Sequence, residues 1–363
     1  AVGAIGSIAT IVLGLGLDTW GLPPILAVVL ALGMGVLAGW INGMLITRLK
    51  IDSFIVTLSM MFIFMGLMVQ KSGVADNLFH TLQLWVGRIP GSLAIVTVMT
   101  GALIAATVGV FSASIIMLGL TGLPAMMKAN YNKGLAYGSV IAGGCLGILI
   151  PPSIMLVIYG PMSSLSVGKL FMGAFGAGVS RAIFYMIYIL IRCAVTPNYA
   201  PTISLEEQQV PLNTKLKLLV TSLLPPVFLI LAVLGSIFFG IAAPTEAAGI
   251  GALASLILVA AYKRLSWSVL TDVLYTTFKL SGFIIILVIG ASIFTGIFLR
   301  LGGGKVVADL ILASPGGKWG AFALLMFIIF LLGMFLDWIG ILLIIVPIVT
   351  PIGSALGFHP IWF

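Results

Sequence analysis

Long apolar stretches separated by short polar breaks run along most of this 363-residue chain. A helix needs about 20 apolar residues to cross a bilayer core of about 30 Å. Several stretches are longer than one crossing, and several are interrupted by Gly, Pro or a polar residue. The pattern predicts an all-α polytopic membrane protein with some broken helices. The apolar stretches lie near 1–17, 21–47, 53–69, 92–120, 135–160, 168–193, 218–262, 281–299 and 319–352.

One clearly polar segment, residues 194–217, divides the chain, and Arg192, Lys215 and Lys217 flank it. Lys and Arg gather in cytoplasmic loops of membrane proteins, so we expect a cytoplasmic linker here. A mixed stretch near 265–280 suits an amphipathic helix lying at the membrane surface. The predicted parts are N-terminal transmembrane helices over 1–60, a first repeat over 61–193, the linker over 194–217, and a second repeat over 218–363.

Composition agrees with lipid as the solvent, because 61% of the residues are hydrophobic and only 7% are charged, against about 25% charged in soluble domains. The excess of 17 Lys+Arg over 9 Asp+Glu fits the bias of cytoplasmic loops and does not indicate nucleic-acid binding. Neither the two cysteines nor the two histidines belong to a metal-binding or nucleophile motif. We therefore expect no enzyme and no transition-metal site.

Weak internal repetition links the two halves of the chain. Ile63 and Ile293 stand in similar short segments, 230 positions apart, and polar breaks after Phe111 and Phe335 are 224 positions apart. Duplicated halves with matching interrupted helices are typical of secondary transporters. Chance similarity between apolar segments is the alternative.

The first candidate site is the Gly- and Pro-rich run from Gly147 to Ser153. Pro151 and Pro152 have no backbone N–H, so carbonyls one turn earlier lose their helical partners. Within a bilayer such carbonyls need protein, water or a cation. The run predicts an unwound helix with Gly147, Ile150 and Pro151 binding a cation and Ser153 binding substrate, or else a purely structural kink.

The polar breaks give a second pair of candidates, because both surrounding stretches are too long for one crossing. A re-entrant hairpin would bring Ser112 and Ser114 to mid-membrane depth as cation ligands, although they could also be packing hydroxyls. Asp337, with Gly340 just after it, is costly in lipid unless it faces a cavity or partner. It could bind a cation, relay a proton or cap a helix. Thr350, further along, is a candidate substrate-binding residue.

A third motif contains Thr245 and Glu246. The chain is apolar for 36 residues between Pro226 and Lys263, which predicts two short crossings that meet at this motif. Capping of a helix start by these residues is the favoured interpretation. Substrate binding by Thr245 and Glu246 is the alternative.

From about residue 61 to its end the sequence resembles the large membrane subunit of TRAP transporters, the tripartite ATP-independent periplasmic family. Segments 61–78, 147–160, 243–253 and 332–352 carry the resemblance, in family order. It implies an elevator-type importer with inverted repeats, re-entrant hairpins and unwound helices in the bacterial inner membrane. Sodium ions would couple the import of a small organic acid, such as a C4-dicarboxylate, with no other cofactor. The implied partners are a small four-helix membrane subunit and a periplasmic solute-binding protein.

Two features depart from that resemblance. Residues 32–68 look more like the permease of ATP-driven ABC sugar importers, which is the alternative function. A second Pro-Pro pair, expected 224 positions after Pro151, would fall beyond Phe363. We therefore expect the full chain to be longer and to carry the second half of a cation site there.

Overall fold

A computed structural model describes residues 53–87, 89–109, 111–201 and 211–363, with five isolated positions between 23 and 33. The described residues form helices joined by short turns and contain no strand. Six of these helices are long and apolar enough to cross a membrane, or seven if one bent pair counts as a span. The predicted fold class, an all-α polytopic membrane protein, is confirmed. Most of the predicted N-terminal part, 1–60, lies outside the described residues.

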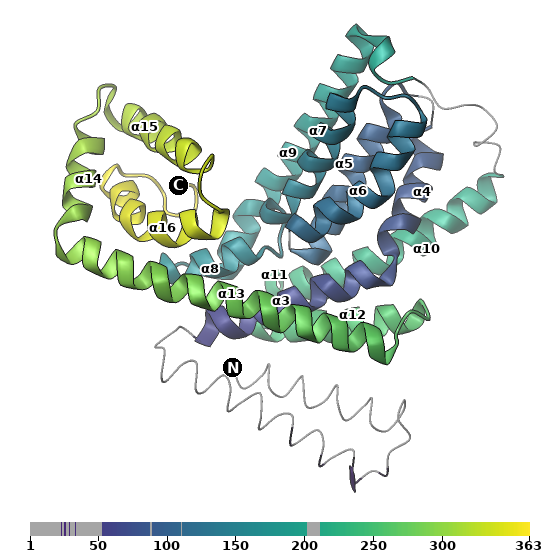
Figure 1. Cartoon of the computed structure of the whole chain (residues 1–363), viewed down its shortest axis with the longest axis horizontal. Coiled ribbons are helices and arrows are strands. Elements are labelled where there is room, and N and C mark those ends of the chain that lie inside the picture. The colour runs from purple at the N-terminus through teal and green to yellow at the C-terminus, as the bar shows by residue number, and fades with distance from the viewer. Residues whose placement is uncertain are drawn as a thin grey trace.

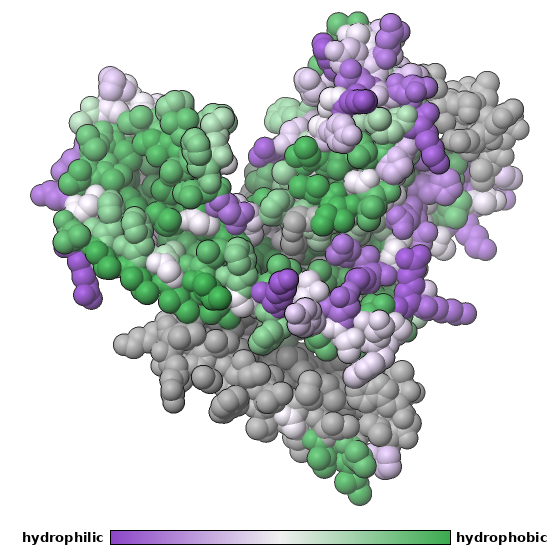
Figure 2. All heavy atoms as spheres, in the orientation of Figure 1, coloured by the Kyte–Doolittle hydropathy of each residue, from purple (hydrophilic) through white to green (hydrophobic). Residues whose placement is uncertain are grey.

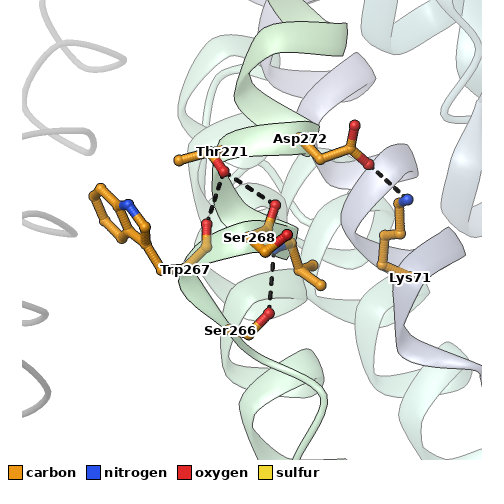
Figure 3. Close-up of polar contacts among 7 residues, drawn as sticks. Lys71, Ser266, Trp267, Ser268, Thr271 and Asp272 are labelled. Carbon is orange, nitrogen blue, oxygen red and sulfur yellow. Dashed lines mark hydrogen bonds and ion pairs between the residues drawn. The ribbon is translucent and has the colours of Figure 1, made fainter.

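Helix α3 (Ser53–Ser72) bends by 60° into α4 (Val74–Val86). The bend is at Gly73, whose φ of 76° is a left-handed conformation that suits glycine. The Arg264 side chain lies against this glycine, where any Cβ would collide with the guanidinium. An ion pair of 2.6 Å between Lys71 of α3 and Asp272 ties α3 to the start of α13 (Figure 3).

Helices α5 to α9 form a bundle on one side of α3 (Figure 1). Helices α5 and α7 approach closely, because a Cβ on Gly101 would lie 2.7 Å from the Gly143 carbonyl oxygen. Small residues let membrane helices approach this closely. The bundle consists of α5 (Ser92–Val108), α6 (Phe111–Lys128), α7 (Lys133–Leu149), α8 (Ile154–Met162) and α9 (Val167–Val195).

After α9 a short 3-10 helix, η1 (Pro197–Tyr199), precedes α10 (Leu212–Ile230). Residues 202–210 of the predicted linker lie outside the described part. A π-helical turn, η3 (Leu231–Gly235), and α11 (Ser236–Phe238) extend α10, and α12 (Pro244–Ala261) follows. Two helices do meet near residue 243, as predicted, and 212–238 and 244–261 each qualify as a span. The first is not the short crossing expected after Pro226, because it already begins at Leu212.

Helix α13 (Trp267–Arg300) is a single helix of 34 residues that packs against α3. The prediction of a separate interfacial helix at 265–280 is wrong, because helical hydrogen bonding continues through the mixed segment into the apolar one. The remaining helices, α14 (Gly303–Leu312), α15 (Gly317–Leu332) and α16 (Trp338–Ala355), form a second group at the far end of α13 (Figure 1).

The order of helices and breaks in α3–α6 recurs in α13–α16. Left-handed glycines separate the first two helices of each series, Gly73 (φ 76°) and Gly302 (φ 81°), and precede the third, Gly91 (φ 81°) and Gly316 (φ 96°). These pairs are 229 and 225 positions apart, close to the spacing seen in the sequence. The recurrence agrees with a duplication, while the inverted relation of the two copies stays a prediction.

The surface over α14 to α16 and the adjoining end of α13 is mostly hydrophobic (Figure 2). Large apolar side chains such as Phe327, Phe330 and Phe335 are exposed there, the last by 86%. A soluble monomer rarely exposes so large an apolar patch. Lipid or a membrane partner therefore covers this surface.

Candidate functional site

The first polar break is a tight turn between α5 and α6. Helix α5 ends at Val108, and Gly109 (φ 65°) donates its N–H to the Ala105 carbonyl. Ser112 and Ser114 therefore lie in the first turn of α6, and the prediction that they form the tip itself is wrong. A tight turn needs the left-handed conformation that glycine supplies, so the chain reverses at Gly109. The two helices are 17 and 18 residues long, and α5 is too short for a full span.

The predicted unwound helix is present between α7 and α8. Helix α7 ends at Leu149, Ile150 is extended, and α8 starts at Ile154. The Ser153 hydroxyl donates to the Ile148 carbonyl, one of the carbonyls that the prolines leave without a helical partner. Ile150, Pro151, Pro152 and Ser153 are all buried.

The turn of the first hairpin packs directly on this unwound segment. A Cβ on Gly109 would come within 2.5 Å of the Pro152 carbonyl oxygen. One on Gly147 would lie 3.3 Å from the Ser114 hydroxyl oxygen, and Ser114 is fully buried. The structure thus brings Ser114, Gly147 and the Pro-Pro segment together. The side chain of Ser112 lies outside the described part.

Asp337 is the last residue of the second polar break, residues 333–337, and the N-cap of α16. One oxygen of its carboxylate accepts the Ile339 N–H at 3.3 Å, so Asp337 does cap the helix. The side chain is nevertheless exposed, and its other oxygen has no protein donor among the described residues. Gly340 lies in the first turn of α16, and no atom lies within 4 Å of a Cβ built there.

Both breaks face one cavity of about 250 Å³. The rings of Phe111 and Trp338, which both line it, contact each other edge to face, with centroids 6.3 Å apart and planes at 90°. Helices α3 and α13 supply an apolar wall opposite the two breaks. The lining residues are Ile63, Gly109, Phe111, Ile154, Leu280, Phe283, Ile284, Asp337, Trp338 and Ile339.

Three helices begin at this cavity, because Phe111, Ile154 and Trp338 are the first residues of α6, α8 and α16. The first N–H groups of a helix have no partner within it and carry a partial positive charge of about +0.5. Asp337 is the one charged side chain among the described lining residues. Nowhere in the described ranges do three His, Cys, Asp or Glu side chains cluster as a metal site would require.

None of the four predicted substrate residues is among the cavity's described lining residues; Ser153 stands directly before Ile154, and its hydroxyl bonds to the Ile148 carbonyl. The Glu246 carboxylate accepts the Ala243 N–H at 3.0 Å, so capping by Glu246 is confirmed. The helix begins at Pro244 with Ala243 as its N-cap, so the prediction that Thr245 is the N-cap is wrong. Thr245 lies beside Glu246 in the first turn of α12. Thr350 bonds to the Val346 carbonyl at 2.7 Å. At a rise of about 1.5 Å per residue it is about 18 Å along α16 from Trp338.

Sequence reasoning missed the aromatic side of the cavity. Phe111 and Trp338 each stand directly beside a polar break, Phe111 before Ser112 and Trp338 after Asp337. That adjacency was the available signal in the sequence. Nothing in the sequence marks Leu280, Phe283 and Ile284 of α13, because their role depends on how α13 packs against α3.

A family model described as the DctM component of the tripartite ATP-independent periplasmic transporter matches residues 25–363. The chain belongs to this TRAP transporter family. It is 30% identical to the sialic acid TRAP transporter large permease protein SiaM of Vibrio cholerae, over 86% of this chain and 72% of that protein. It is also 30% identical to the C4-dicarboxylate TRAP transporter large permease protein DctM of Pseudomonas aeruginosa, over 83% of this chain and 69% of that protein.

Another TRAP relative, the ectoine/5-hydroxyectoine large permease protein UehC of Ruegeria pomeroyi, is 27% identical over 83% of this chain and 69% of its own length. These relatives are permeases and not enzymes. With its apolar helices, the chain is a multi-pass inner-membrane protein. The TRAP family match begins at residue 25, so it includes the 32–68 segment that also resembles ABC permeases.

Proposed function

We propose that this TRAP large permease imports a small organic acid and couples the import to sodium entry. A small four-helix membrane subunit and a periplasmic solute-binding protein would be its partners, as the family description implies. The observation that carries the proposal is the cavity where three helices begin and both hairpin breaks meet.

The helix starts support an anionic solute. N-termini of broken helices bind anionic groups of substrates in transporters, because their free N–H groups and dipoles favour negative charge. A volume of about 250 Å³ lies just below the range of about 300–1,000 Å³ for drug-sized ligands, so a small solute fits. The carboxylates named for the relatives, sialic acid and C4-dicarboxylates, agree with this class.

The contact between the first hairpin and the unwound segment supports a sodium site. Sodium prefers oxygen ligands, and this contact places the Ser114 hydroxyl beside Gly147, whose carbonyl is one that Pro151 leaves without a helical partner. Carbonyls freed within a membrane need a partner that lipid cannot supply. Ser114, Gly147, Ile150 and Pro151 are therefore the proposed ligands on this side.

Gly340 occupies the matching position at the second break, which supports a sodium-binding role for the backbone there, while the Asp337 carboxylate faces the cavity. The recurring order of α3–α6 and α13–α16 likewise supports inverted repeats and an elevator mechanism. In that mechanism the two hairpins and the unwound helix would move together against α3 and α13. The cavity lies between these two parts and would open to alternate sides of the membrane.

The proposal is tested by the sodium dependence of the purified membrane complex. Sodium should raise its melting temperature more than equal potassium, and Ser114→Ala should weaken the apparent sodium affinity at least fivefold. Ser180→Ala is the matched control, because the Ser180 hydroxyl is exposed on α9 and bonds only to the Gly176 carbonyl four residues earlier. Equal sodium affinity in wild type, Ser114→Ala and Ser180→Ala would refute the proposal that sodium binds at this site.

A further inference from the structure

The cavity between the two breaks carries a negative side chain and aromatic rings but no positive side chain among its described lining residues. Asp337 presents the carboxylate, with one oxygen engaged by Ile339 and the other available. The rings of Phe111 and Trp338 pack against each other at a right angle beside it, and Phe283 is a third aromatic lining residue. Aromatic faces beside a carboxylate are a typical binding arrangement for cationic nitrogen, above all quaternary ammonium.

The charges of the site can be compared with those of a solute. Three helix N-termini contribute about +1.5 together, at about +0.5 each, and the Asp337 carboxylate contributes −1. The remainder of about +0.5, before any sodium binds, fits a solute whose net charge lies between 0 and −1, and within that range the carboxylate and the aromatic rings favour a zwitterion. A dicarboxylate would place its second negative charge near Asp337 without a cationic side chain to receive it.

We propose that the solute accepted by this cavity is a zwitterion, with one carboxylate at the helix N-termini and a cationic nitrogen between Asp337 and the rings of Phe111 and Trp338. Its aliphatic part would lie on the apolar wall of Ile63, Leu280 and Ile284. This inference rests on the proposed transport function and narrows its substrate class, away from a dicarboxylate.

Direct binding to the purified membrane complex tests the inference without the selectivity of the solute-binding protein. Three probes are compared at one saturating sodium concentration by ligand-observed NMR titration. They are glycine betaine, with a carboxylate and a quaternary ammonium group, succinate, with two carboxylates, and butyrate, with one. Glycine betaine should bind at least tenfold more tightly than succinate or butyrate.

Two variants locate the selectivity. Asp337→Asn keeps an efficient helix cap but removes the charge, and it should reduce the preference for glycine betaine over succinate at least tenfold. Trp338→Leu should weaken the affinity for glycine betaine at least fivefold and change the affinity for butyrate by less than twofold. Asp309→Asn, at an exposed carboxylate of α14 outside the cavity lining, should change neither ratio. Each variant is first shown to retain the wild-type melting temperature within a few degrees.

Several results would overturn the inference. Succinate binding as tightly as glycine betaine would do so, and so would an unchanged preference in Asp337→Asn. Asp337→Asn could instead lower sodium affinity and leave the ratio of glycine betaine affinity to succinate affinity unchanged. That result would show that Asp337 binds sodium and does not recognise the charge of the solute. In that case, or if succinate is transported together with sodium, the proposed transport function is retained and the proposal of a zwitterionic solute is refuted. Failure of that function would instead show as loss of all sodium-dependent binding and flux.

Discussion

Replacement of Gly109 by alanine tests whether the first hairpin rests on the unwound helix. Gly109 has a φ of 65°, and a Cβ there would come within 2.5 Å of the Pro152 carbonyl oxygen. The left-handed conformation costs an L-residue about 1–2 kcal/mol. Overpacking against backbone that cannot rotate away costs about a further 1–3 kcal/mol. Gly109→Ala should therefore lose about 2–5 kcal/mol of unfolding free energy.

Gly240 provides a matched control, because its φ is 70° and no atom lies within 4 Å of a Cβ built there. Gly240→Ala should lose only the conformational part, about 1–2 kcal/mol. Equilibrium unfolding of both variants in mixed micelles measures the difference. Gly109→Ala should also weaken the sodium-dependent stabilisation, since it separates Ser114 from Gly147. Equal losses in the two variants, with unchanged sodium dependence, would refute the packing of the turn on Pro152.

Three further predictions concern other parts of the fold. Gly101→Ala should lower stability by about 1–3 kcal/mol, because its Cβ would meet the Gly143 backbone. Gly138→Ala, on open α7 surface, should be neutral or stabilising, and the reverse order would contradict the α5–α7 contact. Removal of the half-exposed Lys71–Asp272 pair should cost less than about 1 kcal/mol in a double-mutant cycle and less still at high salt. A coupling energy that is larger than this and independent of salt would show that the ion pair is not screened by solvent. Glu246→Ala should lose about 0.5–1 kcal/mol of stability with transport retained, and a large loss of transport at normal stability would assign Glu246 a functional role.

Breaks in the helices were predictable from sequence because their causes are local. Pro151 and Pro152 remove backbone donors wherever they stand, and the unwound segment follows from that alone. The helix cap at Glu246 is equally local, since a carboxylate in the first turn can reach the N–H of the residue before the helix. The end of a hairpin was harder to place, because Gly109 competes with the nearby serines as the turning residue.

The contents of the cavity could not be predicted, because they depend on packing between distant helices. Phe111 and Trp338 are 227 positions apart, and only the meeting of the two breaks brings their rings to 6.3 Å. Thr350 was predicted to bind substrate, yet the rise of α16 carries it away from the helix start. The continuity of α13 was also hidden, because a mixed segment followed by an apolar one reads as two elements.

The most direct test of the central claim is uptake by proteoliposomes that contain this chain with its small membrane subunit. The solute-binding protein and a radiolabelled solute are supplied outside, an inward sodium gradient is imposed, and ATP is absent. The account predicts accumulation that stops when potassium replaces sodium or when the gradient is collapsed. Accumulation that ignores the sodium gradient and requires ATP hydrolysis would contradict it and favour the ABC-type alternative.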